Sequence, residues 1–208
     1  MLGTTRPRRI EWVQTPTHPT RSVSGGCHAS RLSSPAVGKP PNTPYRPDVD
    51  EDAEPVTGLG DLLDVVGTSL DWANQRARGA VLRRVELHDC RLTGAELAEA
   101  ALTDVTLVEC RLDLAGLRMA RLERVVFRGC RMSECDLYAA TLKDVVFDHC
   151  DLREATLTDA RMTRVELRGC ELTGLRGAAA LRGARMPFAD VLENGHLFAT
   201  ALGIEILE

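Results

Sequence analysis

The large hydrophobic residues of this chain recur every five positions over a long uninterrupted stretch. From Leu82 to Leu172, every fifth residue is large and apolar: fifteen Leu, two Phe and two Met. Two residues before each of these lies a small apolar residue, from Ala80 to Cys170, comprising eight Ala, five Val and six Cys. A helix repeats every 3.6 residues and a strand every two, so this period predicts that each five-residue unit forms one short extended piece and one turn.

A second period of twenty residues is superimposed on the first. It is visible in the Val residues from Val85 to Val165 and in the Cys residues from Cys90 to Cys170. Four units therefore return the chain to the same side, which predicts a solenoid of square cross-section with coils about 4.8 Å apart, the spacing of paired strands. Connections of this kind are expected to wind right-handed. The nineteen units make about five coils, or a regular stack roughly 24 Å tall.

The pattern Ala/Val/Cys, any, Leu/Phe/Met, any, any resembles that of the pentapeptide-repeat proteins and covers residues 80–172 without a gap. The resemblance implies an all-β solenoid, a right-handed quadrilateral β-helix in which the central Leu or Phe and the residue two before it point inward. That family often has Asp or Asn just before the central residue. Here this position is mixed, beginning with Glu86, Arg91 and Glu96, a departure that concerns the surface and not the fold.

The segments beside the repeat predict how the stack begins and ends. Residues 56–79 are interpreted as a degenerate first coil: Leu70 and Trp72 occupy the inward registers, but Gln75 and Ala77 break the pattern. The regular β-helix is expected over residues 80–186. Its register slips by one residue near the end and resumes in two pairs, Ala179/Leu181 and Ala184/Met186.

Residues 187–208 predict a short α-helical cap followed by a terminal strand. Apolar residues recur at helical spacing after Pro187, Asn194-Gly195 is expected to divide the segment into two short helices, and Gly203 suits the helix stop. A final strand is expected at Ile204, Ile206 and Leu207. The segment is interpreted as a lid over the open coil. The alternative is a homodimer contact through the cap or a coil end, because an exposed strand edge invites pairing.

Residues 1–55 differ sharply in composition from the rest of the chain. They hold nine of the ten Pro, many Ser and Thr, and no apolar periodicity, which predicts a disordered tail. The tail is basic as far as Pro47 and acidic after it. A solvated tail is favoured over a nucleic-acid contact. An export signal is not expected, because no apolar run follows Arg8-Arg9.

Composition and candidate chemistry argue against an enzyme. The 208 residues carry a formal charge of −4 and seven Cys, with no apolar run near the length of a membrane span. Five Cys stack twenty residues apart without a C-x-x-C pair, which predicts reduced, buried thiols, a cytoplasmic location and no metal site. No nucleophile, base and acid converge, no glycine loop suits a phosphate, and a filled solenoid offers no cleft. We therefore predict no catalytic residues, no cofactor and no small-molecule substrate.

The twenty-residue step assigns outward residues to columns. One column alternates as Arg84, Asp104, Arg124, Asp144 and Arg164, which predicts ion pairs between coils. Another column stacks Arg91, Arg111 and Arg131 above Asp151 and Glu171. It is interpreted as a network of ion pairs, and the alternative is a stripe of Arg side chains that contacts anions. Apolar outward residues mark a further possible contact surface. The candidate partner-surface residues are Val108, Val126, Val146, Met119, Tyr138, Arg118, Arg91, Arg111 and Arg131.

These features favour a non-enzymatic protein-binding or scaffold module of the bacterial cytoplasm, with an unknown partner. The alternative is implied by the resemblance: some family members bind DNA gyrase as duplex-like acidic rods and protect against quinolones. Residues 57–208 contain 24 acids and 19 bases, but their columns alternate in sign, so gyrase binding is not favoured. A third hypothesis is a nucleic-acid or acidic partner bound by the basic tail and the Arg column.

Overall fold

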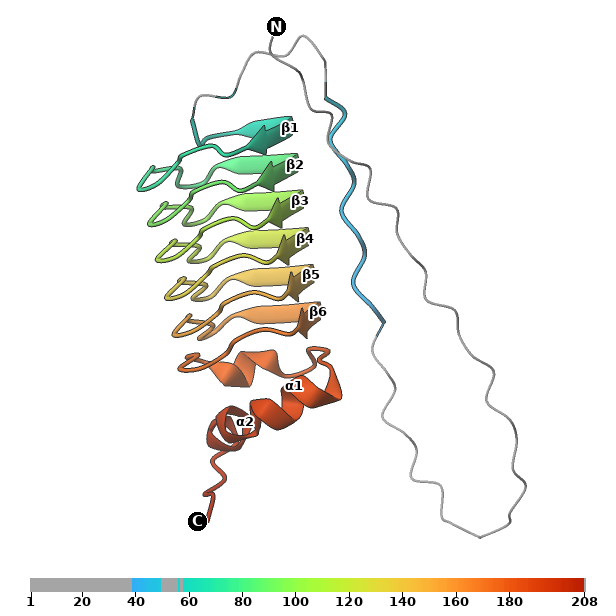
Figure 1. Cartoon of the computed structure of the whole chain (residues 1–208), viewed down its shortest axis with the longest axis vertical. Coiled ribbons are helices and arrows are strands. Elements are labelled where there is room, and N and C mark those ends of the chain that lie inside the picture. The colour runs from blue at the N-terminus through green and yellow to red at the C-terminus, as the bar shows by residue number, and fades with distance from the viewer. Residues whose placement is uncertain (1–38, 50–55, 57, 208) are drawn as a thin grey trace, which may run out of the picture. The chain divides into compact units, whose positions relative to one another are not determined.

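The computed structural model describes residues 39–49, 56 and 58–207. Six parallel strands form one sheet in chain order, and each residue pairs with the residue twenty positions further on, as Leu82 does with Leu102. The stack of coils seen in Figure 1 confirms the predicted solenoid. The strands are β1 (Leu62–Thr68), β2 (Val81–His88), β3 (Ala101–Val108), β4 (Arg121–Arg128), β5 (Thr141–Asp148) and β6 (Arg161–Arg168).

Each coil has four sides. A strand covers two of them, because it bends at a central residue such as Arg84, whose φ is 50°. The other two sides are joined to neighbouring coils by single bridges such as Arg91 to Arg111 and Glu96 to Gly116. In the coil that starts at residue 80 we number the sides in chain order, with corners between them. The first to fourth sides are residues 80–83, 85–88, 90–93 and 95–98, and the corners are residues 84, 89, 94 and 99.

The corners explain the five-residue period. Every fifth residue from Asp64 to Gly174 has a positive φ, between 50° and 73°. Each such residue turns the chain toward the next side. At the corners before and after the fourth side, a hydrogen bond such as Ala95 N to Leu92 O (3.0 Å) closes the turn. Left-handed backbone is uncommon for residues other than Gly, so the stacked coils impose this conformation on whichever residue occupies a corner.

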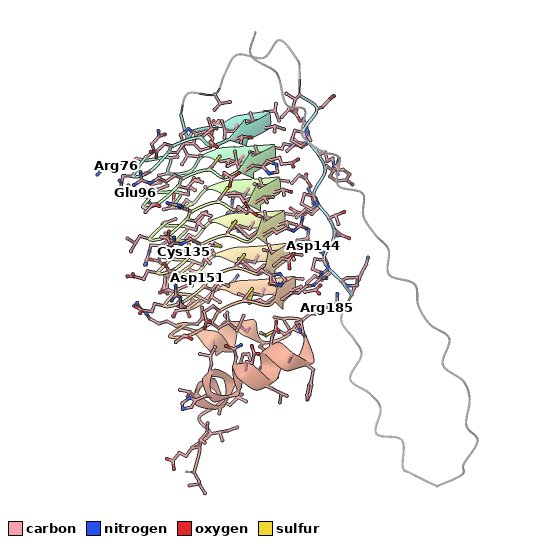
Figure 2. All side chains as sticks on the ribbon, in the orientation of Figure 1. Arg76, Glu96, Cys135, Asp144, Asp151 and Arg185 are labelled. Atoms are coloured by element: carbon pink, nitrogen blue, oxygen red, sulfur yellow. The ribbon has the colours of Figure 1, made fainter. Side chains whose placement is uncertain are left out.

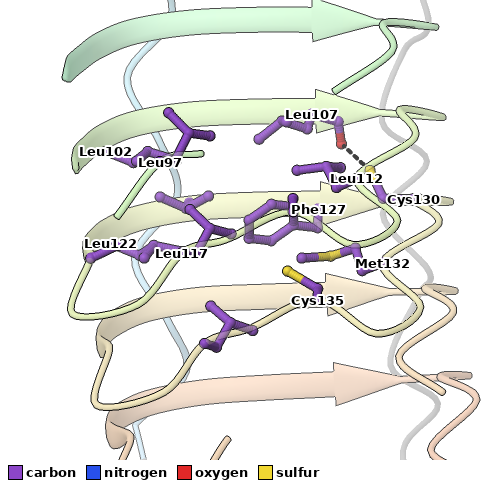
Figure 3. Packing of buried hydrophobic residues seen from close by; sticks show 14 of the residues in the cluster. Leu97, Leu102, Leu107, Leu112, Leu117, Leu122, Phe127, Cys130, Met132 and Cys135 are labelled. Atoms are coloured by element: carbon purple, nitrogen blue, oxygen red, sulfur yellow. Dashed lines mark hydrogen bonds between the residues drawn. The ribbon is translucent and has the colours of Figure 1, made fainter. Parts of the chain in front are cut away.

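The interior of the solenoid is filled by the two predicted inward registers. Eighteen of the nineteen large residues and eighteen of the nineteen small ones are buried; Met162 and Ala160, in the last regular coil, are partly exposed. Figure 3 shows this packing around Phe127, whose ring stacks on that of Phe147 with centroids 5.1 Å apart. The apolar interior therefore leaves polar chemistry to the sides and corners.

Six described Cys are free and buried, as predicted for reduced thiols. The Cys130 thiol donates to the carbonyl of Leu107 in the preceding coil, 3.5 Å away (Figure 3), and the other stacked thiols likewise donate to a carbonyl of the preceding coil. The neighbouring thiol of Cys110 and burial raise the pKa of Cys130. Burial raises the pKa of Cys135 to about 12. These two thiols are therefore protonated at neutral pH and poor nucleophiles.

The first coil is more regular than its sequence suggests. β1 pairs with β2, Trp72 is buried, and Ala77, which was expected to break the pattern, is buried as well. Gln75 fits in this first coil because its side-chain oxygen accepts the amide of Leu59 at 2.7 Å. The polar residue thus satisfies an amide at the open end of the stack.

The C-terminal region confirms the two short helices and corrects two details. A 3-10 helix, η1 (Ala178–Leu181), precedes α1 (Phe188–Glu193) and α2 (Gly195–Ala201), which meet at Asn194. The expected inward pair Ala179/Leu181 is wrong at Ala179, which is exposed, because η1 buries Ala178 and Leu181 at a spacing of three. The expected strand at 204–207 is also wrong. These residues lie beyond α2, away from the strand edges (Figure 1), and Leu207 is 90% exposed.

The tail expectation needs a partial correction. Residues 1–38 and 50–55 lie outside the described residues, so the predicted disorder is not addressed there. Residues 39–49, which we call the strap, belong to the same compact unit as the solenoid and hydrogen-bond to it. The prediction of disorder considered only apolar burial, whereas the strap is held through its backbone amides.

Candidate interaction surface

One corner column forms a ladder of ion pairs, as the alternating charges predicted. We call it the Asp/Arg corner; its residues are Asp64, Arg84, Asp104, Arg124, Asp144 and Arg164. Each Arg reaches back one coil and holds both oxygens of the preceding Asp, as Arg124 does for Asp104 at 2.6 and 3.0 Å. Asp104 and Asp144 are only 5% and 1% exposed. Such bidentate geometry orients the carboxylate as well as neutralising it.

The carboxylates of this column remain ionised far below neutral pH. The Arg164 hydrogen bond, opposed by burial and assisted by the Asn42 amide, lowers the pKa of Asp144 to about 2. For Asp104, burial acts to raise the pKa, but hydrogen bonds from Arg124 and the Tyr45 amide outweigh it, and the pKa lies below its usual value. The column therefore presents fixed acceptors and fixed cations.

The three Arg of the third side stack one above another, as expected. Arg91 lies 3.4 Å from Asp71, and Arg131 lies 3.8 Å from Asp113, which also accepts the Ser133 hydroxyl at 2.7 Å. Two of the three Arg thus have an acidic neighbour, which favours a paired network over a stripe that contacts anions.

The valines of the second side offer little accessible apolar surface. Val126 and Val146 pair directly between β4 and β5, and both are half-buried. Val108 lies in another row, where it is aligned with Arg128. The three predicted valines therefore share the second side but lie in two different rows of it.

The fourth side brings together Arg118, Tyr138 and Asp136. The Arg118 guanidinium lies 4.4 Å from the centre of the Tyr138 ring and 2.8 Å from an Asp136 oxygen. Asp136 also accepts the amide of Tyr138 at 2.9 Å. These contacts fix an aromatic ring and a cation in one place on the surface.

Two exposed apolar side chains lie at the corners that bound this side. Leu114 and Met119 are 58% and 46% exposed, with φ values of 60° and 57°. Together with Arg118, Asp136 and Tyr138 they form what we call the fourth-side patch. Sequence analysis included Met119 but missed Leu114. The corner register could have identified it, because Leu114 and Met119 are the only large apolar residues in that register from Asp64 to Gly174.

A cavity of about 300 Å³ lies between α2 and the last coil, lined in part by Thr173, Glu193 and His196. Within residues 39–49, 56 and 58–207, no group of three His, Cys, Asp or Glu side chains is placed to hold a metal ion. Among the same residues, no helix has the length and apolarity needed to cross a membrane.

The geometry defines a class of protein: a filled, four-sided β-solenoid with one corner every five residues and one coil every twenty. Comparison with known families agrees, because the pentapeptide repeats (8 copies) model matches residues 76–107 and the pentapeptide repeat region model matches residues 115–176. The chain belongs to the pentapeptide-repeat family. Proteins of this family are generally non-enzymatic structural or binding modules.

Several solved structures are similar to this chain. A pentapeptide repeat protein from the Arabidopsis thaliana thylakoid lumen is 22% identical over 50% of this chain and 69% of its own, with a TM-score of 0.45. HetL from Nostoc sp. strain PCC 7120, a pentapeptide repeat protein involved in heterocyst differentiation regulation, is 21% identical. The match covers 60% of this chain and 69% of HetL, with a TM-score of 0.30. Full-length QnrB1, a plasmid-mediated fluoroquinolone resistance protein, is 11% identical. The match covers 71% of this chain and 100% of QnrB1, with a TM-score of 0.38. No curated protein matches the sequence.

Proposed function

We propose that this protein is a non-enzymatic binding module that contacts a protein partner through the fourth-side patch. The observation that carries the proposal is the placement of Leu114 and Met119, which are exposed at left-handed corners. Both side chains remain about half exposed there, and neither suits the backbone conformation. Two unfavourable choices on one side of one coil are best explained by a contact outside the chain.

The neighbouring residues suit a protein interface. Met, Tyr and Arg are enriched at the centres of such interfaces. The Tyr138 ring is already held against Arg118, and Arg118 is held by Asp136, so little side-chain freedom is lost on binding. The patch therefore combines flexible apolar side chains with a preorganised aromatic ring.

The charge pattern favours a protein partner over imitation of DNA. A duplex imitator needs uncompensated columns of acids. In the Asp/Arg corner every Asp is paired with an Arg, and on the third side Arg91 and Arg131 pair with acids. We accordingly propose that purified gyrase supercoils DNA at the same rate with and without micromolar amounts of this protein. The free thiols suit a reducing compartment such as the bacterial cytoplasm.

The proposal is tested by capture from the native host followed by affinity measurement with the purified partner. The test variant is Leu114→Asn with Met119→Asn. The matched control is Glu134→Asn with Ala139→Asn, which changes the same two corner columns one coil further on. We expect the test variant to lose the partner by about tenfold or more in Kd, and the control to retain it. Equal retention by both variants would refute the proposal.

A further inference from the structure

The strap is joined to the Asp/Arg corner by a regular set of hydrogen bonds. Three backbone amides spaced three residues apart donate to three carboxylates spaced forty residues apart. Figure 2 shows Asp144 on the flank that the described strap follows, and Arg76 and Glu96 on the opposite flank. The pairs are Asn42 N to Asp144 Oδ1 (3.0 Å), Tyr45 N to Asp104 Oδ1 (3.1 Å) and Asp48 N to Asp64 Oδ1 (3.1 Å).

The two spacings match the geometry of a polyproline II helix. Such a helix has three residues per turn and rises about 3.1 Å per residue, or roughly 9.3 Å per turn. Two coils of the solenoid span about 9.6 Å at the usual strand spacing. One turn of the strap therefore advances by almost the same distance as two coils, and every third amide meets the next Asp.

The prolines of the strap enforce this register. Pro41, Pro44 and Pro47 come immediately before the three donor residues. Proline fixes φ in the polyproline II range and biases the residue before it toward extended backbone. Because Pro has no amide hydrogen, it also offers no competing donor. In the repeat Pro-x-y, the amide of x therefore faces the same side of the polyproline II helix in every turn, the side that lies against the Asp/Arg corner.

The carboxylates are prepared to receive these amides. Arg124 fixes the plane of the Asp104 carboxylate through two hydrogen bonds, and the Tyr45 amide binds Oδ1 beside it. A carboxylate has about four acceptor positions, so both partners bind together. The Tyr45 ring lies 5.7 Å from the Arg124 guanidinium, and the Asn42 side chain adds a second bond to Asp144 at 3.1 Å.

Only this corner column has the required alternation. The column through residue 89 continues with Glu109, Gly129 and His149, and the column through residue 99 continues with Met119 and Ala139. None of the other three columns places an acid in every second coil with an Arg between. The alternation of the corner column and the three-residue period of the strap are separate features of the chain that coincide at one surface.

We propose that the Asp/Arg corner is a binding site for polyproline II segments that carry a free amide at every third residue, with the strap as its ligand in cis. A second segment of pattern Pro-x-y-Pro-x-y-Pro competes for the same carboxylates. The strap is linked to the first coil through residues 50–57, so its effective concentration is on the order of millimolar and it holds the site against weak competitors. This site is separate from the fourth-side patch, because Leu114 lies at the diagonally opposite corner.

The test uses a fluorescein-labelled peptide with the sequence of residues 39–49, titrated against the full-length chain by fluorescence anisotropy. In a full-length variant carrying Asn42→Pro, Tyr45→Pro and Asp48→Pro, the strap loses its three donors but keeps its extended preference. We expect the peptide to bind this variant at least about tenfold more tightly than the wild-type chain. A peptide with Pro at the three donor positions should not bind.

Column variants locate the peptide on the corner. In the donor-free variant, Asp104→Ala is expected to weaken peptide binding about tenfold. Asp159→Ala, at an exposed left-handed corner of another column, should leave it unchanged, and thermal melting verifies that each variant is folded. The proposal is overturned if the donor-free variant fails to bind the peptide, if it binds no better than wild type, or if Asp104→Ala has no effect. Wild-type oligomers that the peptide dissociates would also overturn it, because the strap would then act between copies.

Discussion

The Asp/Arg corner and the corners of the fourth side share one backbone conformation and differ in what they do with it. At the Asp/Arg corner, charged residues pair between coils and the strap covers them. At the fourth side, Leu114 and Met119 are left exposed beside a fixed aromatic ring. The inward registers are nearly the same beneath both, so the difference shows that corner residues can change the surface without changing the fold.

The largest effect is expected from breaking the interior that both corners share. Leu137→Asp should unfold the domain, because it places an unpaired charge in an apolar interior at a cost of several kcal/mol or more. Thr141→Asp, which is four residues away and exposed, should change the free energy of unfolding by less than about 0.5 kcal/mol. Circular dichroism during thermal melting compares the two. Similar melting of both variants would mean that the inward register is misassigned.

A smaller effect is expected from removing one acid of the Asp/Arg corner. Asp144→Ala leaves Arg164 and the Asn42 amide without their shared acceptor. We expect the free energy of unfolding to fall by about 2 kcal/mol. Asp159→Ala imposes the same change on a left-handed corner that is exposed, and should cost at most about half as much. Urea denaturation distinguishes them, and equal losses would show that the ladder adds nothing to stability.

Acid should weaken the Asp/Arg corner selectively. Asp64 and Asp144 have pKa values of about 2 in the folded chain, held down first by Arg84 and Arg164 and also by strap amides. Their unfolded pKa is about 3.9. Since the folded pKa is the lower one, their contribution to stability is complete above about pH 4 and is lost as the pH falls toward 2.

The measurement is the urea midpoint of wild type and of Asp144→Asn between about pH 2 and pH 6. The wild-type midpoint should fall more steeply over the acid part of this range than that of the variant. Parallel curves would contradict the assignment of the low pKa to Asp144.

The smallest change in the free energy of unfolding is expected at the corners of the fourth side. Leu114→Asn should stabilise the chain by a few tenths of a kcal/mol to about 1 kcal/mol, because Asn tolerates left-handed backbone better than Leu. The control Glu134→Asn changes a polar corner of the same column and should gain less. Urea denaturation reads out both. A clear loss of stability in Leu114→Asn would mean that Leu114 supports the fold, and the proposed contact role would lose its main observation.

The sequence predicted the interior and the ion-pair ladder because both depend on side chains at fixed steps. Five-residue steps assign residues to the inside, and twenty-residue steps place Arg124 above Asp104. The strap was missed because its bonds use backbone amides, whose only trace in the sequence is the three-residue spacing of Pro41, Pro44 and Pro47. The strand expected at 204–207 was wrong because apolar composition alone does not supply a strand edge to pair with.

The fourth-side patch was predicted in part for a similar reason. Tyr138, Met119 and Arg118 stand out as residue types, and the twenty-residue step placed them close together. Leu114 does not stand out, because Leu is the commonest inward residue of the repeat. It is recognisable only by its register, in a corner column that otherwise holds Asn, Gly and Glu.

Residue-resolved amide hydrogen exchange of the full-length chain tests most directly whether the Asp/Arg corner binds every third amide of the strap. The amides of Asn42, Tyr45 and Asp48 are predicted to exchange at least about tenfold more slowly than those of Thr43 and Arg46, giving a three-residue rhythm along the strap. Asp104→Ala should remove protection at Tyr45 first. Uniform, fast exchange across residues 39–49 would contradict the account.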